Sequence, residues 1–340
     1  MRTLTRTLSV FILMVLLSSL AVLSAFDGLY PRPLGPQFDI RVAQNYRNDI
    51  EAQKTEVLLL GDSMLGKGVD AEKLEEYLGQ SVYKVDIPGG SSAMWYLIMK
   101  SNIYPADYTP KTLVIFFRGT MLTTPDFRVE GSSNLGLLNK YATMEDTLFR
   151  RLAYTERMNP VDKAFSLYLP IYGYRTEIVT ALDAGFRHTL PGLLNGCDPE
   201  CADDAMEEVL RGDIAPEQLA DYIIRSDMVL YAGRKLDFPY QLGHSFLPEM
   251  VRMAKEKGMG VVMVHMPTEI FPDTALEPEG LAGYNADMEV YLEAQGIPLL
   301  NFEHDPRFLP EDFTEPTHLN NEAKQRFTKI LAEALLELGP

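Results

Sequence analysis

Short apolar segments alternate with longer amphipathic ones along most of the chain. Five apolar runs have the length and composition of buried strands, at 57–60, 82–87, 112–117, 260–265 and 298–301. Helix-like stretches lie between or after them, at 71–78, 93–102, 245–257, 284–295 and 321–338. Strands that alternate with helices form a parallel sheet covered on both faces. We therefore expect an α/β fold with three layers, of the flavodoxin-like kind.

One region departs from this alternation. Residues 126–243 carry aromatic patches and acidic helix-like segments instead of strand signals. We interpret this region as a long, largely helical insertion in an α/β domain that spans 51–338. Residues 28–50 form a linker and lead-in segment, because they begin with several prolines and glycines.

The first residues have the pattern of a membrane-targeting segment. Arg2 and Arg6 precede an apolar stretch over 8–26, and the next charge is Asp27. This charge distribution predicts an exported chain on the periplasmic or extracellular side, anchored to the cytoplasmic membrane by 8–26. The small residues around Ser19 leave a cleaved signal peptide over 1–27 as the alternative.

Composition excludes some partners. The formal charge of −17 argues against nucleic acid, because phosphate binding depends on lysine and arginine. Cys197 and Cys201 are the only cysteines. In an exported protein this close pair predicts a local disulfide; a metal site would need further ligands, and we expect no metal.

A Gly-Asp-Ser turn follows the first apolar run. Gly61 permits a tight turn, and Ser63 falls at the carboxyl end of the predicted strand, where α/β folds bind ligands. Ser63 is therefore a candidate nucleophile whose own N–H could face an oxyanion. The same tripeptide is also ordinary turn composition, so a structural turn is the alternative.

The second and third strands end in further candidates. Gly89 and Gly90 could bring a bare backbone N–H close to a substrate, while the serines after them could instead cap the next helix. Arg118 leaves the third strand at the same edge. It could stabilise an anion or clamp an acidic group, or it could form an ordinary ion pair.

An acid and an imidazole precede the last helix. Glu315 and His318 are three residues apart, so the carboxylate could hold one ring nitrogen while the other takes the serine proton. A helix cap or a surface pair is the alternative. All the candidates fall at one edge of the predicted sheet, and this agreement favours a catalytic site.

These motifs resemble those of the SGNH, or GDSL, hydrolase superfamily. Gly61-Asp62-Ser63 matches the nucleophile block, Pro88-Gly89-Gly90 the glycine block, and Glu315-Pro316-Thr317-His318 the Asp-x-x-His block. The resemblance implies Ser63 as nucleophile, His318 as base and Glu315 as its orienting acid. It also implies that the N–H groups of Ser63 and Gly90 donate to the oxyanion.

Two positions depart from the family pattern. Glu315 stands where the family has Asp, with Asp312 as a fallback. The third block supplies an oxyanion Asn in the family, whereas this chain has Arg118-Gly119-Thr120. Loss of one oxyanion donor costs about 2.7 to 4 kcal/mol of transition-state stabilisation. Either Arg118 or Thr120 then substitutes for the Asn, or the activity differs from ordinary ester hydrolysis.

Exported members of this superfamily suggest a function. The resemblance implies an enzyme, without a cofactor, that acylates or deacylates a cell-surface polysaccharide, alongside a membrane-bound O-acyltransferase as partner. A plain esterase or lipase acting on small esters is one alternative. A non-catalytic envelope scaffold or glycan-binding subunit is another, because two positions of the site depart from the family pattern.

Overall fold

The computed structural model describes residues 2–25, 30–31, 34, 45–128, 146–175, 177–179, 181–182, 216–271 and 274–339. The chain divides into two compact units. One comprises 1–37, 131–133 and 154–214, and the other comprises 38–130, 134–153 and 215–340. Cys197 and Cys201 lie outside the described residues, so their predicted disulfide stays a prediction.

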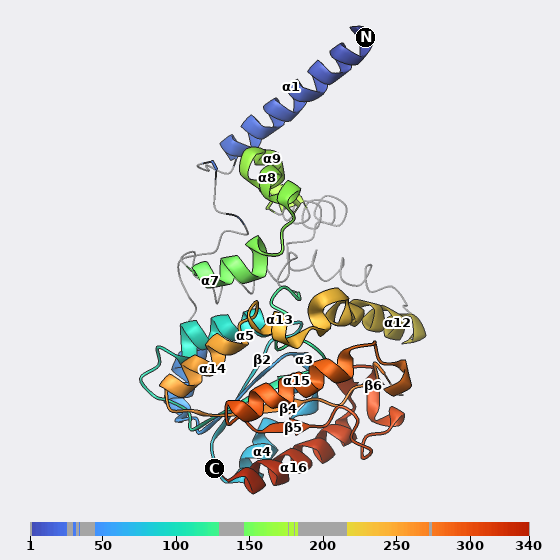
Figure 1. The fold of residues 1–340 in the computed structure, drawn as a ribbon. Helices are drawn as coiled ribbons and strands as arrows, with labels where there is room; N and C mark the ends of the chain where they lie inside the picture. Colours follow the sequence, from blue (N-terminus) through green and yellow to red (C-terminus); the bar gives the residue numbers. More distant parts are fainter. Residues whose placement is uncertain are drawn as a thin grey trace, which may run out of the picture. The chain divides into compact units, whose positions relative to one another are not determined.

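The larger unit is built on a parallel sheet of five strands (Figure 1). Their order is β2-β1-β3-β4-β5, which confirms the predicted α/β class and its flavodoxin-like arrangement. The strands are β1 (Val57–Gly61), β2 (Val82–Asp86), β3 (Thr112–Phe117), β4 (Gly260–His265) and β5 (Leu299–Asn301). In this order the chain reverses direction across the sheet between β1 and β3, so a crevice is expected beyond their carboxyl ends.

Helices cover both faces of the sheet, because the strand side chains are apolar on both sides. On one face, Leu59, Val114 and Val264 pack into a core with Leu74 and Phe327 from the covering helices. These helices are α3 (Ser63–Gly68), α4 (Ala71–Leu78) and α16 (Asn321–Leu338). The other face is covered by α5 (Ser92–Ile98) and α14 (Leu247–Glu256), which contact each other. Figure 1 shows the two layers on either side of the strands.

The remaining elements of the larger unit are short, and most are helical. Before the sheet lies α2 (Asn45–Gln53), and a π-helical turn, η1 (Met99–Ile103), continues α5. After β3 come α7 (Thr147–Phe149) and the start of the π-helical η2 (Arg150–Thr155). The chain returns through α12 (Pro216–Asp227), η3 (Met228–Tyr231), η4 (Gly233–Leu236) and α13 (Phe238–Leu242). The last elements are η5 (Thr274–Leu276), α15 (Leu281–Ala294), η6 (Pro310–Asp312) and the antiparallel pair β6 (Phe313–Glu315) and β7 (His318–Leu319).

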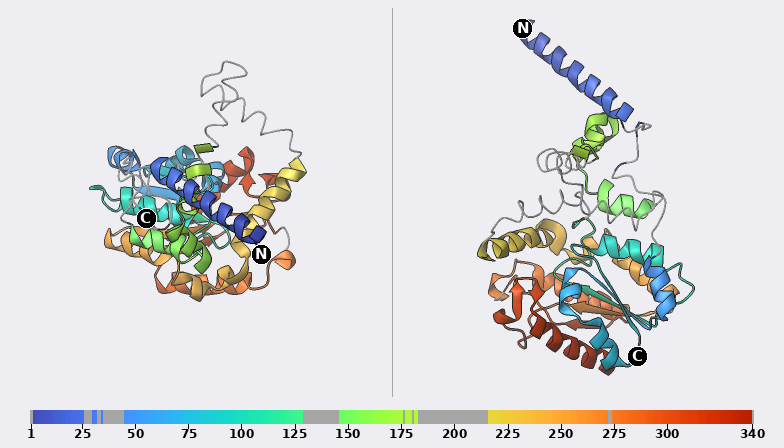
Figure 2. Two further views of the ribbon diagram at one scale, coloured as in Figure 1. Left: turned by 90° about the horizontal axis from the view of Figure 1, so that it is seen from above. Right: turned by 180° about the vertical axis from the view of Figure 1, so that it is seen from behind.

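The smaller unit combines the N-terminal helix with part of the predicted insertion. Its helices are α1 (Arg2–Ala25), α8 (Pro160–Tyr168) and α9 (Pro170–Gly173). Within α1, Thr5–Ala25 is long and apolar enough to cross a membrane, a property that a signal sequence shares. Both α1 and α8 pack against α9. Figures 1 and 2 show the pair α8 and α9 beside the end of α1.

Candidate active site

Ser63 occupies a sharp strand-to-helix turn. The buried strand β1 ends at Gly61, and Ser63 is already the first residue of α3. Asp62 caps this helix, since its Oδ1 accepts the N–H of Met64 at 2.9 Å. A Cβ on residue 61 would lie 2.8 Å from the Cβ of Leu65, so only glycine lets the helix turn back this closely. The sequence pattern missed α3, because its six residues are too short to show a helical period.

His318 and Glu315 lie on neighbouring strands of the two-stranded ribbon. The register pairs Glu315 with His318, which places the two side chains together. The Nε2 atom of His318 lies 2.9 Å from Ser63 Oγ, and its Nδ1 atom is hydrogen-bonded to Glu315 Oε1. A carboxylate can only accept, so Nδ1 carries the hydrogen and Nε2 is left to accept from the serine hydroxyl. The structure therefore joins Ser63 and two residues more than 250 positions further along the chain into one hydrogen-bonded row.

Asp312, the alternative candidate for the acid, contacts other residues than His318. The Asp312 carboxylate pairs with Arg326 and accepts the N–H of Leu309 at 2.8 Å. Burial raises the pKa of Asp312, but the hydrogen bonds from Arg326 and Leu309 lower it more, and the result lies below its ordinary value. Asp312 therefore supports the loop before the ribbon, and Glu315 is the acid that contacts His318.

Arg118 does not point an open guanidinium at the substrate side. Its Nε and Nη2 donate to the two carboxylate oxygens of Asp227 at 2.6 and 3.1 Å, and its Nη1 donates to Asp62. All three residues are buried. Burial lowers the pKa of Arg118, but the two carboxylates raise it further, so it stays charged. Arg118 clamps acidic groups of this chain itself, and through Asp62 it supports the turn that carries Ser63.

Asp227 is the residue of this network that the sequence analysis missed. It ends α12, 109 positions after Arg118, and is fully buried. Its Oδ1 also accepts from Arg128 at 3.4 Å. An arginine directly after an apolar strand can be buried, and a buried arginine needs a carboxylate partner. The sequence therefore indicates that such a partner exists. The chain has 48 acidic residues, so the signal could not select this one.

Thr120 is also engaged within the protein. Its buried hydroxyl donates to the carbonyl oxygen of Leu230 and lies 2.9 Å from Thr124 Oγ1. The intervening Gly119 has a φ of +45°, and a Cβ there would lie 2.5 Å from the hydroxyl oxygen of Tyr231. In this geometry neither Arg118 nor Thr120 presents a side-chain donor that could replace the oxyanion Asn. The segment Arg118-Gly119-Thr120 instead holds in place the residues that follow α12.

The glycine loop is placed at the expected edge, with a different donor geometry. Gly89 has a φ of +70°, and the N–H of Gly90 donates to Ile87 O at 2.8 Å within the turn. The expected oxyanion donor Gly90 is therefore already occupied. The hydroxyls of Ser91 and Ser92 bond to the carbonyls of Phe127 and Thr124. Ser91 therefore makes no side-chain cap on α5 and ties the loop to the segment after β3.

A second acid and imidazole are buried at the end of β4. His265 is fully buried and stacks on Phe117 with ring centroids 4.6 Å apart. Its Nε2 lies 3.5 Å from Glu303 Oε1. Burial lowers the pKa of His265 to about 3 and raises that of Glu303 to about 7, so both groups favour their neutral forms. A fully enclosed ring does not line an open pocket, so His265 is a residue of the core.

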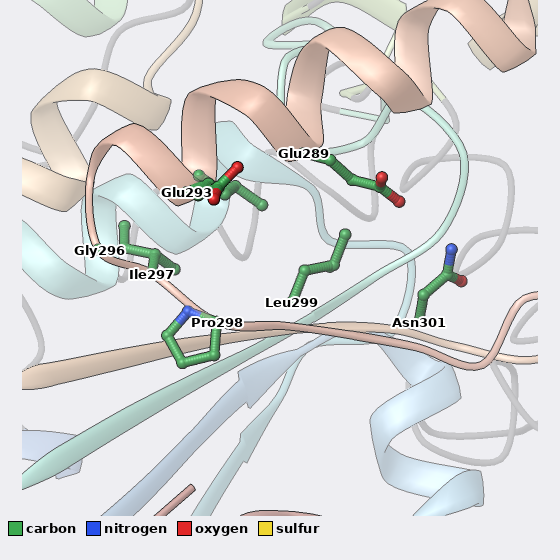
Figure 3. A pocket seen from close by; sticks show the side chains of 8 residues that line it. Glu289, Glu293, Gly296, Ile297, Pro298, Leu299 and Asn301 are labelled. Carbon is green, nitrogen blue, oxygen red and sulfur yellow. The ribbon is translucent and has the colours of Figure 1, made fainter.

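An open pocket lies away from the Ser63 row. It measures about 440 Å³ and runs along α15 and the edge strand β5 (Figure 3). Its lining contains neither Ser63 nor His318, but consists of Glu289, Leu292, Glu293, Gly296, Ile297, Pro298, Leu299 and Asn301. Among the residues that the structure describes, no group of three or more His, Cys, Asp or Glu side chains could hold a metal ion.

Comparisons with known proteins give distant likenesses among solved structures. No protein-family model matches the chain, and no curated protein matches it. A crystal structure from Bacteroides fragilis, of a protein proposed to be an acylhydrolase, is 12% identical with a TM-score of 0.41; the match covers 87% of this chain and 96% of that one. A GDSL-like lipase from Bacteroides thetaiotaomicron is 11% identical with a TM-score of 0.38, over 87% and 99% of the two chains. AlinE4, an SGNH-hydrolase family esterase, is 12% identical with a TM-score of 0.30, over 84% and 97%.

Proposed function

We propose that this chain is an SGNH/GDSL-type serine enzyme that transfers or hydrolyses acyl esters. The observation that carries the proposal is the contact of 2.9 Å between Ser63 Oγ and His318 Nε2, with Glu315 on the other ring nitrogen. A hydroxyl becomes a competent nucleophile only beside a base that is held in the correct tautomer. A Ser63 that only formed a turn, or a Glu315 and His318 that only capped a helix, would not need this hydrogen-bonded row.

The reaction has two halves. In the first, Ser63 Oγ attacks the acyl carbonyl while His318 Nε2 accepts its proton; the ester C–O bond then breaks, and the leaving alcohol takes that proton. In the second, a water or sugar hydroxyl attacks the acyl-enzyme, His318 accepts the new proton, and the C–O bond to Ser63 breaks. Ser63 recovers the proton. Glu315 stabilises the imidazolium that forms in each half.

Oxyanion stabilisation is assigned to the backbone. Ser63 opens α3, and the first N–H groups of a helix have no partner within it. The Ser63 N–H is therefore our first donor. Gly89 remains the candidate for the second, since the N–H of Gly90 is used in its turn. The side chains of Arg118 and Thr120 take no part in this assignment.

The substrate class follows from the location that we propose. Thr5–Ala25 is apolar enough to anchor the chain in a membrane, which favours a surface polysaccharide as the ester-bearing substrate or acyl acceptor. A membrane-bound O-acyltransferase is the partner that would deliver acyl groups there. Product analysis separates transfer from simple hydrolysis: only free acid in the presence of abundant glycan would favour the plain esterase.

Fluorophosphonate labelling tests the proposal. The detergent-solubilised full-length protein should be labelled at Ser63, and Ser63→Ala should abolish labelling without altering thermal unfolding. Ser101→Ala, in the η1 turn, is the matched serine control and should label like the unaltered protein. Equal labelling of the Ser63→Ala protein, or none in the unaltered protein, would exclude the nucleophile and favour the scaffold alternative.

A further inference from the structure

An exposed apolar stripe runs along α8. Val161, Phe165 and Tyr168 are 59%, 48% and 81% exposed. They are separated by four and three positions, which places them on one face of the helix. In a soluble domain such a stripe normally faces the core. Here all three side chains stay about half exposed or more within the described part of their unit.

The opposite side of α8 is fixed within the smaller unit. Ser166 is buried, and its carbonyl oxygen accepts the hydroxyl hydrogen of Tyr30. The ring of Tyr30 also lies 6.5 Å from that of Tyr174, just after α9. These contacts hold α8 in one orientation, so the exposure of its stripe is a property of the folded unit.

The helix that carries the stripe is tied to α1 through α9. Leu13, Leu16 and Leu20 are between 55% and 63% exposed, and α9 joins α1 to α8 by packing against both. The chain next to the stripe is rich in aromatic and basic groups: Arg175 lies 4.2 Å from the centroid of the Tyr172 ring, and Phe165 meets that ring edge-on. Tyrosines and basic side chains collect where hydrocarbon meets lipid headgroups.

We propose that the stripe of Val161, Phe165 and Tyr168 docks into the surface of the bilayer that α1 crosses, so that α8 is an interfacial helix beside a spanning one. The proposal rests on α1 as a membrane anchor. An interfacial helix places its apolar face about 5–10 Å into the boundary between headgroups and acyl chains. Nine residues bind a membrane weakly alone, but an adjoining span holds them at high effective concentration.

A lipid surface fits this stripe better than a protein partner. Stable protein interfaces bury about 800 Å² on each partner, which is far more than three side chains supply. The net charge of −17 makes general adhesion to anionic lipids unfavourable, so α8 would bind the bilayer through its apolar side chains and not through charge.

Tryptophan fluorescence in bilayers tests the docking. Trp95 is the only tryptophan and is fully buried, so it provides a constant background. Full-length Tyr168→Trp protein is reconstituted in phosphatidylcholine vesicles with or without bromine on the acyl chains. Tyr77→Trp, on α4 and 44% exposed, is the matched control. Leu16→Trp reports on α1 itself.

The expected result is strong bromolipid quenching of Tyr168→Trp and Leu16→Trp emission, each several-fold above that of Tyr77→Trp. Quenching of Leu16→Trp alone overturns the docking and leaves the anchor intact. If neither is quenched, α1 does not insert and the docking is overturned with it. An emission change in Tyr168→Trp that follows protein concentration, and not bromination, assigns the stripe to a second copy of the chain and also overturns it. Thermal unfolding of each variant within the range of the unaltered protein shows that the folds are comparable.

Discussion

The guanidinium of Arg118 donates to the carboxylate of Asp62, one residue before the proposed nucleophile. Both side chains are buried, and Asp227 completes the pairing from the far end of the insertion. When a buried arginine pairs with two carboxylates, removal of any one of the three side chains leaves an uncompensated buried charge and destabilises the fold. The nucleophile turn is therefore held by a contact between β3 and α12 as well as by local backbone geometry.

Removal of Arg118 should destabilise the protein severely. Arg118→Met leaves the buried Asp62 without its cation and Asp227 with only the longer contact to Arg128, and breaking a buried pair in this way costs about 3–5 kcal/mol. Urea denaturation of the detergent-solubilised protein measures the free energy of unfolding. Arg252→Met is the matched control, since Arg252 pairs with Glu249 and Glu256 at the surface and should matter little. Equal losses in the two variants would contradict a structural role for the Arg118 network.

Substitution of Glu315 should reduce catalysis, whereas substitution of Asp312 should reduce stability. Glu315→Gln removes the negative charge beside His318 Nδ1 and offers an amide N–H that favours the wrong His318 tautomer, so kcat on an activated ester should fall by about 10²–10⁴-fold with KM little changed. Asp312→Asn weakens the pair with Arg326, so it should lower the unfolding midpoint while most of kcat is retained. The reverse pattern would return the acid role to Asp312.

The strands could be predicted from the sequence because they depend on local patterns, and the order of the strands then places Ser63, Glu315 and His318 at one edge of the sheet. Runs such as Thr112–Phe117 identify themselves by composition, and parallel strands bring their carboxyl ends to one edge. The side-chain partners of Arg118, Thr120 and His265 could not be predicted. Each partner lies on a different segment, and only the packed fold decides which of many equivalent polar groups it meets.

Gly119 should not tolerate a side chain. Its φ of +45° disfavours alanine, and a Cβ would lie 2.5 Å from the Tyr231 hydroxyl oxygen. Gly119→Ala should therefore lower the free energy of unfolding by more than about 1 kcal/mol. Gly283→Ala in the first turn of α15 has open space around its Cβ and should stabilise the protein by about 0.4–1 kcal/mol. Urea denaturation compares the two, and a neutral Gly119→Ala would show that the chain after β3 adjusts freely.

Glu303 should make stability fall as pH rises towards neutrality. Burial raises its pKa from 4.5 to about 7, so between these values the folded protein binds more protons than the unfolded chain. Stability from this group is complete below about pH 4.5 and is lost as pH rises through 7, by at most about 1.4 kcal/mol per pH unit. Its neighbour acts in the opposite sense: the pKa of His265 falls from 6.5 to about 3, so that group stabilises the fold above pH 6.5 and loses this effect in acid.

Replacement of Glu303 by glutamine separates the pH dependence of stability that comes from Glu303 from that of His265. Glu303→Gln keeps the shape and the proximity to Asn285 but cannot ionise. Its free energy of unfolding, minus that of the unaltered protein, should increase from pH 5 to 7 and stay constant above about pH 8. Folded His265 stays neutral over this pH range in both proteins, because its pKa is about 3. Its contribution to the pH dependence of stability is therefore the same in both and cancels in the difference. A difference that is independent of pH across the range would mean that Glu303 ionises as freely in the folded protein as in the unfolded chain, and that the end of β4 is open to water.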